Sequence, residues 1–192
     1  MNRLLIVDDE IAVLNALRRL LTRVPCTVGG KNYPLVIDTQ DDPFAALEQA
    51  RHTAYDLVLS DYRMPGMNGV EFLSAFRQLQ PDAERLILSG YADLNALIEA
   101  INAAGIRRFI AKPWKDYELI AAIGQSLALR AAAVENQSLA DEMRLARGTL
   151  TAEDLERRRL EAEEPGITHV NWGPDGSVLL DESLLDPRQK TD

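Results

Sequence analysis

Short apolar runs alternate with amphipathic stretches through the first 125 residues of the chain. Residues 4–7 form the first apolar run, and the stretch at 10–23 places its leucines on one face at helical spacing. Four further pairs follow, with apolar runs at 35–39, 57–60, 86–89 and 108–111 and helical stretches that begin near residues 43, 69, 93 and 116. Apolar strands that alternate with helices predict a parallel sheet covered on both faces. We therefore expect an α/β fold, a doubly wound (βα)5 unit with a five-stranded parallel sheet.

The connection between the first helix and the second strand is longer than such a unit usually needs. It covers residues 24–34 and contains the pair Gly29-Gly30. Glycines favour tight turns, so this pair predicts a small β-hairpin there. The sequence assigns no role to this insertion.

The composition changes after residue 125. Residues 126–192 contain 14 acidic and 8 basic residues. This segment therefore carries −6 of the net charge of −9 of the whole chain. The last helical stretch has no stop signal before Gly148, and Thr151 begins a capping sequence for a second helix at 151–164. A turn sequence at 173–176 separates two apolar runs and predicts a β-hairpin at 167–180. We expect three parts: a globular unit at 1–125, an extended helix or short coiled coil at 126–150, and an appendage with a helix and hairpin at 151–192.

The extended helix carries a heptad pattern. Its apolar stripe consists of Leu129, Ala132, Asn136, Leu139, Met143, Ala146 and Leu150. This alternation of three and four predicts a coiled-coil seam, with Asn136 at a core position where it sets the register. Glu142 and Arg147 fall at flanking positions where a parallel partner can pair with them. The pattern predicts a homodimer; the alternative is that the stripe packs on its own chain.

Polar side chains follow four of the predicted strands. Asp8 and Asp9 follow the first strand, Asp61 the third, Ser89 the fourth and Lys112 the fifth. In an open parallel sheet, ligands bind beyond the carboxyl ends of the strands, so these side chains are expected to meet at one edge. Three neighbouring carboxylates repel one another unless a cation joins them, and a site of oxygen ligands alone favours Mg²⁺. A carboxylate of such a cluster can act as a nucleophile towards phosphorus, with Lys112 and the metal offsetting the charge.

Each of these residues also has an ordinary structural interpretation. Asp8 and Asp9 can cap the helix at 10–23, and Asp61 can belong to a simple turn. Ser89 next to a glycine is common in turns, and a single lysine such as Lys112 is most often solvated. The chemical interpretation is favoured because all five stand at strand ends of one predicted edge.

Four motifs at these strand ends are similar to those of a known family. They are Ile6-Val-Asp-Asp-Glu10, Asp61-Tyr-Arg-Met-Pro-Gly-Met-Asn-Gly69, Leu88-Ser-Gly90 and Phe109-Ile-Ala-Lys-Pro113. With them, residues 1–125 resemble the CheY-like receiver domain of two-component response regulators. The resemblance implies a sheet with strand order 2-1-3-4-5 and phosphorylation of Asp61 by a histidine kinase. It also implies that Asp9, Asp61 and the backbone carbonyl of Arg63 bind Mg²⁺ directly, with Asp8 acting mainly through water.

The resemblance also assigns a switch. Ser89 would be the switch hydroxyl and Phe109 the switch aromatic, although Phe109 can also be a simple core residue. Lys112 would pair with the phosphoryl group, and the Lys112-Pro113 peptide bond would be cis. Phosphorylation would alter a surface that partners contact, and the C-terminal extension would carry the change to a dimer interface or to a protein target that the sequence does not identify.

Bulk properties narrow the class of protein further. A chain of pI near 4.8 is poorly suited to bind DNA directly, because such affinity comes largely from neutralised phosphates. Cys26 is the sole cysteine and the sequence shows no membrane span, so we expect a cytoplasmic protein. We expect a phosphoacceptor switch and not an enzyme that turns over a metabolite. Two alternatives remain: an aspartyl-phosphate phosphatase, which Arg63 disfavours because such enzymes usually carry an acid there, and a phosphate sink or phosphorelay receiver without its own output.

Overall fold

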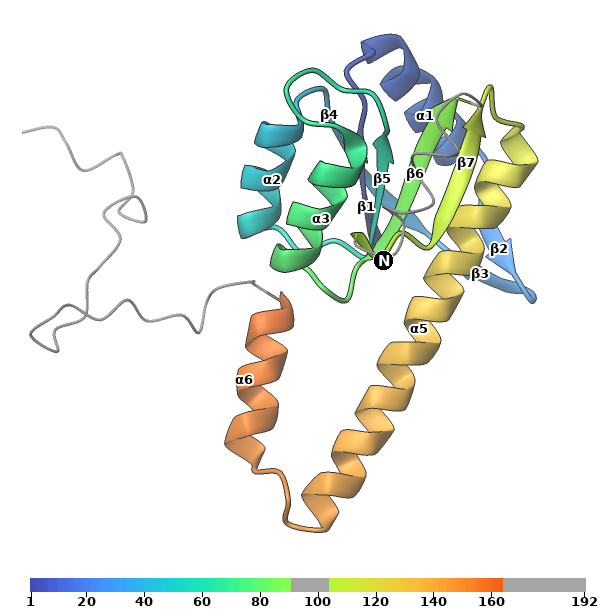
Figure 1. Ribbon diagram of the computed structural model, residues 1–192. Coiled ribbons are helices and arrows are strands. Elements are labelled where there is room, and N and C mark those ends of the chain that lie inside the picture. Colours follow the sequence, from blue (N-terminus) through green and yellow to red (C-terminus); the bar gives the residue numbers. More distant parts are fainter. Residues whose placement is uncertain (91–103, 164–192) are drawn as a thin grey trace, which may run out of the picture.

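A five-stranded parallel sheet forms the centre of the computed structural model, which describes residues 1–90 and 104–163 (Figure 1). The strands are β1 (Asn2–Val7), β4 (Leu35–Gln40), β5 (Leu57–Asp61), β6 (Glu84–Gly90) and β7 (Arg108–Lys112). Their order across the sheet is β4-β1-β5-β6-β7, and every neighbouring pair is parallel. This confirms the predicted (βα)5 class and the strand order 2-1-3-4-5. The helix predicted at 93–103 lies outside the described residues.

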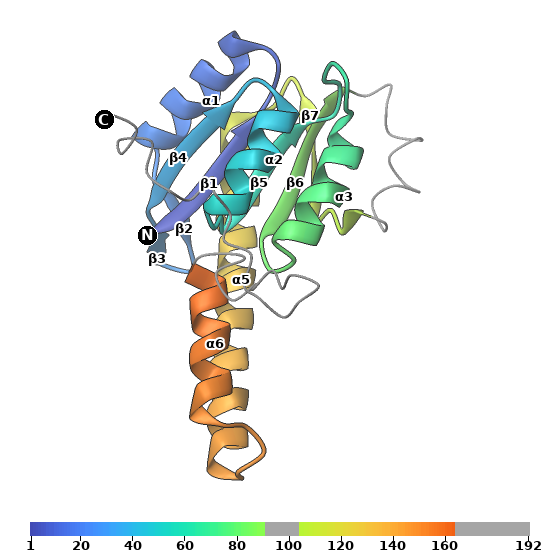
Figure 2. The ribbon, with the colours of Figure 1, turned by 90° about the vertical axis from the view of Figure 1, so that its left-hand side faces the viewer.

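Helices cover both faces of the sheet (Figures 1 and 2). The helices are α1 (Ile11–Arg23) and α5 (Asp116–Ala146) on one face, and α2 (Pro43–His52) and α3 (Gly69–Leu79) on the other. Successive side chains of a strand point to opposite faces, so β1 supplies Leu4 and Ile6 to the first core and Leu5 and Val7 to the second. All four of these side chains are fully buried. Burial on both faces explains why the strands read as continuous apolar runs.

The long connection after α1 forms the predicted hairpin. Strands β2 (Cys26–Val28) and β3 (Lys31–Tyr33) pair in antiparallel register around Gly29 and Gly30, whose φ angles are 56° and 79°. The hairpin lies against α5, where a Cβ added at Gly124 would stand 2.9 Å from the Cγ2 of Val28. Close contact between β2 and α5 therefore depends on a glycine at this position.

Helix α5 is 31 residues long and continues beyond the sheet without a break at residue 125. It ends before Gly148, which has a φ of 69°, and α6 (Ala152–Glu163) runs back towards the base of the sheet (Figures 1 and 2). The start of α6 confirms the capping sequence: the backbone N–H of Asp154 donates to the Thr151 hydroxyl over 3.1 Å. The hairpin predicted at 167–180 lies outside the described residues.

In the parts of the chain that the structure describes, no helix combines the length and the apolar character needed to cross a membrane.

Candidate functional site

The carboxyl edge of the sheet brings together three of the predicted site residues. The ammonium of Lys112, at the end of β7, lies 2.8 Å from the Oδ2 of Asp8 and 2.5 Å from the Oδ1 of Asp61. Asp8 follows β1 and is fully buried, and Asp61 ends β5 and is 5% exposed. One cation thus bridges two buried carboxylates from adjacent strands.

Backbone amides hold the two carboxylates in place. The N–H of Glu10 donates to the Oδ1 of Asp8 over 2.9 Å, and the N–H of Arg63 donates to the Oδ2 of Asp61 over 2.7 Å. Each carboxylate therefore uses one oxygen for its own loop and the other for Lys112. This arrangement fixes the orientation of both groups.

The turn after Asp61 requires a glycine at position 69. A Cβ at Gly69 would lie 2.1 Å from the carbonyl oxygen of Asp61, which no side chain can tolerate. The N–H of Gly69 donates to the carbonyl of Tyr62 over 2.8 Å and closes the turn. Asn68 then begins α3 with a capping box completed by Glu71. Gly69 is part of the motif that begins at Asp61, but the sequence alone did not predict its role. Its position directly after Asn68, which caps α3, is the sequence feature that could have indicated it.

The electrostatics of the site follow from burial and pairing. Burial raises the pKa of Asp8, and the hydrogen bonds from Lys112 and from the Glu10 amide oppose this shift only in part. For Lys112, burial acts to lower the pKa, but the hydrogen bonds to Asp61 and Asp8 outweigh it and raise the pKa. Lys112 is therefore a stable ammonium at neutral pH, and it supplies a positive charge at the Asp61 carboxylate.

The two predicted switch residues stand on neighbouring strands. Ser89 is buried near the end of β6, where its hydroxyl donates to the carbonyl of Gly90 over 3.4 Å. Phe109 is half-buried on β7 and packs against the core on the α2 and α3 face. The Lys112-Pro113 peptide bond is cis, as the resemblance implied.

The Asp9 side chain is exposed at the edge of the site. Arg63, whose backbone carbonyl is the predicted ligand, contacts Asp61 through its backbone N–H. Within residues 1–90 and 104–163, no three side chains of His, Cys, Asp or Glu are gathered closely enough to hold a metal ion. The donor chemistry nevertheless fits Mg²⁺, because Asp8 and Asp61 offer carboxylate oxygens at one edge and neither sulfur nor imidazole lies among the site residues.

Comparison with known proteins gives the family of this chain. The model of the response regulator receiver domain matches residues 4–124, which include Asp8, Asp61, Ser89 and Lys112. The chain belongs to the response regulator receiver family. Receiver domains are signalling switches that are phosphorylated by histidine kinases and generally bind Mg²⁺ at an acidic site.

Individual relatives show the range of proteins that contain similar receivers. The hydrogenase transcriptional regulatory protein HoxA of Cupriavidus necator is 36% identical over 139 residues, which are 72% of this chain and 25% of HoxA. The cyclic di-GMP phosphodiesterase response regulator RpfG of Xanthomonas campestris pv. campestris is 31% identical over 173 residues, 88% of this chain and 44% of RpfG. The signal receiver domain of an HD domain-containing protein from Pseudomonas fluorescens Pf-5 superposes with a TM-score of 0.61 at 30% identity, covering 68% of this chain and 98% of that structure. This receiver thus spans less than half the length of either curated relative.

Proposed function

We propose that this receiver is a phosphorylation switch in which Asp61 accepts a phosphoryl group from a histidine kinase in a Mg²⁺-dependent reaction. The observation that supports it is the buried Asp61 carboxylate at the carboxyl edge of the sheet, with the Lys112 ammonium 2.5 Å from its Oδ1. Such an arrangement orients the nucleophile and supplies positive charge where a phosphoryl group arrives.

In the transfer step, an oxygen of Asp61 forms a bond to phosphorus while the bond from phosphorus to the donor imidazole nitrogen breaks. The nitrogen keeps the electron pair of that bond and later takes up a proton. Lys112 stays protonated and offsets the charge on the transferred group, and the Ser89 hydroxyl donates to one of its oxygens. A Mg²⁺ ion held directly by Asp9, Asp61 and the backbone carbonyl of Arg63, with Asp8 acting mainly through water, would supply further positive charge.

Phosphorylation replaces the single negative charge of Asp61 with nearly two and adds acceptor oxygens. Ser89 moves towards these oxygens, and Phe109 turns inward into the space that Ser89 leaves. Because α5 follows β7 directly, the change reaches the helix that extends beyond the sheet. In this proposal, the receiver at 1–125 is followed by a connecting helix at 126–150 and an appendage at 151–192.

The predicted heptad seam on α5 supports a homodimer as the output. Two of its large side chains, Leu129 and Met143, are 56% and 62% exposed. At about 100° per residue, Met143 lies about 200° around the helix from Asp141, which contacts Arg158 of α6. Helix α6 therefore attaches to the side of α5 opposite the seam and leaves the seam open for a second copy. A dimer formed there would present the C-terminal appendage to a protein partner.

Labelling with a small-molecule phosphodonor tests the switch. We expect covalent phosphorylation of the natural protein at a stoichiometry of one, dependent on Mg²⁺ and abolished in Asp61→Asn. Labelling of Asp61→Asn at the natural rate, or labelling that ignores chelation of Mg²⁺, would contradict the proposal. Sustained release of phosphate from an ester over many turnovers would instead indicate a phosphatase.

Light scattering tests the output. We expect the mass of the full chain to change on addition of beryllium fluoride with Mg²⁺, a phosphoryl mimic. Met143→Asp, on the seam, should leave a monomer under both conditions. The matched control is Val134→Asp, on the α6 side of the same helix, which should keep the natural mass. A dimer that survives Met143→Asp would exclude this interface.

A further inference from the structure

A pocket of about 420 Å³ lies at the base of the sheet, at the opposite end from the Asp61 site. Its walls come from the start of β1, the β2–β3 hairpin, the loop before β5 and one side of α5. The residues that line the pocket include Asn2, Lys31, Asp56, Leu127, Arg130 and Val134, together with Leu139 of the heptad seam. Val134 is seven residues from Asp141, about 20° around the helix, so this is the side of α5 to which α6 is attached.

The pocket combines an apolar wall with one unsatisfied donor. Leu127 is buried against the receiver core, whereas Val134 is 52% exposed although it faces the hollow. The Nη2 of Arg130 pairs with the Oδ1 of Asp56 at 3.2 Å, but its buried Nε has no hydrogen-bond partner among the described residues. Buried donors are nearly always paired, so this Nε is available to an acceptor such as a carbonyl oxygen.

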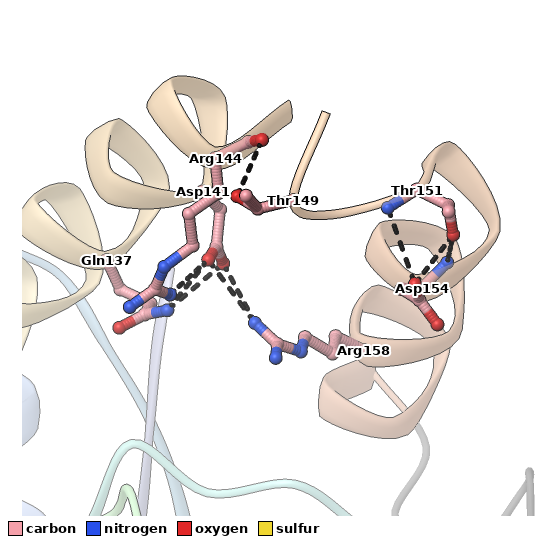
Figure 3. Close-up of polar contacts among 7 residues, drawn as sticks. All are labelled: Gln137, Asp141, Arg144, Thr149, Thr151, Asp154 and Arg158. Atoms are coloured by element: carbon pink, nitrogen blue, oxygen red, sulfur yellow. Dashed lines mark hydrogen bonds and ion pairs between the residues drawn. The ribbon is translucent and has the colours of Figure 1, made fainter. Parts of the chain in front are cut away.

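Helix α6 returns along α5 and ends near the base of the receiver. Figure 3 shows the Asp141 carboxylate of α5 with Gln137, Arg144 and Arg158 around it, and Arg158 comes from α6. The Nη1 of Arg158 lies 3.3 Å and 3.4 Å from the two oxygens of Asp141, and this contact holds the helices antiparallel. Both ribbon views place the end of α6 just below the base of the receiver (Figures 1 and 2). A segment that follows Glu163 therefore starts near the base of the receiver, where Asn2 and Asp56 line the pocket.

The sequence after α6 contains an apolar segment whose side chains and backbone carbonyls suit the Val134 wall and the Arg130 donor. Its apolar residues are Ile167, Val170, Trp172, Val178, Leu179 and Leu180. Trp172 follows Glu163 by nine residues, which can reach about 30 Å when extended, more than the length of α6 itself. A short tether gives an effective concentration in the millimolar range, so this segment outcompetes a second copy of the chain at ordinary protein concentrations.

We propose that residues 167–180 dock in this pocket of their own chain, with the Trp172 side chain against Leu127 and Val134 and a backbone carbonyl on the Nε of Arg130. The docked segment ties the C-terminal appendage to the base of the receiver. It lies mainly on the α6 side of α5, although Leu139 of the heptad seam also lines the pocket.

Tryptophan fluorescence of the full chain tests the proposal. The sequence contains two tryptophans, so Trp114→Phe leaves Trp172 as the sole reporter. We expect emission at short wavelength and weak quenching by acrylamide. Val134→Asp in this background should shift the emission to longer wavelength and increase the quenching several-fold. Met143→Asp, with the same change of charge on the other side of α5, should alter neither.

Three outcomes would overturn the proposal: a solvent-exposed Trp172 in the parent protein, equal shifts in the two aspartate variants, or a shift that depends on protein concentration. The last would show that a second copy supplies the segment. If Trp114→Phe disturbs folding, fluorine resonances of 5-fluorotryptophan in the unsubstituted chain give the same readout, with Trp172→Phe used to assign them. None of these measurements depends on Asp61, so their outcome is independent of the outcome of the labelling experiment.

Discussion

The ammonium of Lys112 lies 2.8 Å from the Oδ2 of Asp8, a residue 104 positions earlier in the chain. Asp8 is fully buried, and its pKa is raised by that burial. The charged form of Asp8 is therefore costly by itself and depends on Lys112. The same ammonium also pairs with Asp61, so one residue near the end of the receiver contacts two acids from the start and the middle of the chain.

Replacing Lys112 with methionine should therefore destabilise the receiver. Removal of one partner from a buried ion pair commonly costs about 3 kcal/mol, because the other charge is left without compensation. We expect a lower midpoint of urea unfolding for Lys112→Met, measured in the presence of a chelator. Lys112→Met combined with Asp61→Asn should lose less than the sum of the two single effects, since only one buried carboxylate then remains. Additive effects would mean that Lys112 and Asp61 are not coupled.

Gly69→Ala should disrupt the turn that carries Asp61. The new methyl group would stand 2.1 Å from the Asp61 carbonyl, so backbone and carboxylate must both move. We expect a loss of stability and a reduced rate of labelling by a small-molecule phosphodonor. Gly66→Ala is the matched control: its φ of 78° is strained for alanine, but its Cβ would meet only the ring of Phe44 at 3.2 Å. If Gly66→Ala impairs labelling as strongly as Gly69→Ala, the contact with Asp61 is not the cause.

Asp141 should make the attachment of α6 sensitive to acid. The hydrogen bond from Gln137, with Arg144 and Arg158 nearby, holds the pKa of Asp141 below its usual range. A lowered folded pKa means that the stabilising contact is complete above the ordinary aspartate pKa of about 3.9 and is lost as the pH falls through the lowered value. A carboxyl NMR titration measures this directly. Arg158→Gln should raise the pKa of Asp141 towards the ordinary value; an unchanged pKa would show that α6 contributes nothing.

Asn136→Val should change the proposed dimer in a characteristic way. A polar side chain at a core position of a coiled coil costs stability but sets register and the number of strands. We expect Asn136→Val to dissociate at lower protein concentration than the natural dimer and to populate a mixture of assemblies in sedimentation measurements. Asn15→Val, on α1 of the receiver, provides a control of the same chemical change away from the seam. A uniform dimer of unchanged affinity in Asn136→Val would place this residue outside the interface.

Local rules were sufficient for many elements of the fold. Gly29 and Gly30 predicted a turn because only glycine adopts positive φ easily, and both do so. Thr151 predicted the start of α6 because its hydroxyl can cap the backbone N–H three residues later. The apolar runs predicted the strands because both faces of the sheet are covered, and the strand ends then grouped Asp8, Asp61 and Lys112.

Contacts between distant parts of the chain were not accessible in this way. No spacing along the sequence indicates that Lys112 bridges both carboxylates. The bridge depends on where the Lys112 side chain of β7 places its ammonium relative to the ends of β1 and β5. Gly69 is essential only because the Asp61 carbonyl folds back onto it. The contact of Arg158 with Asp141 depends on the angle between α5 and α6. This angle cannot be read from the spacing of residues along the sequence.

The hairpin insertion has a mechanical consequence for the long helix. Val28 presses on Gly124, and six residues later the Arg130–Asp56 ion pair attaches the same helix to the sheet. Beyond Arg130, the second of these attachments, about 24 Å of helix continues to Ala146. A rotation of this part by about 5° would move its far end by about 2 Å. Small rearrangements near Asp61 would thus cause larger displacements at the end of α5. These displacements would be large enough to make or break contacts with another protein.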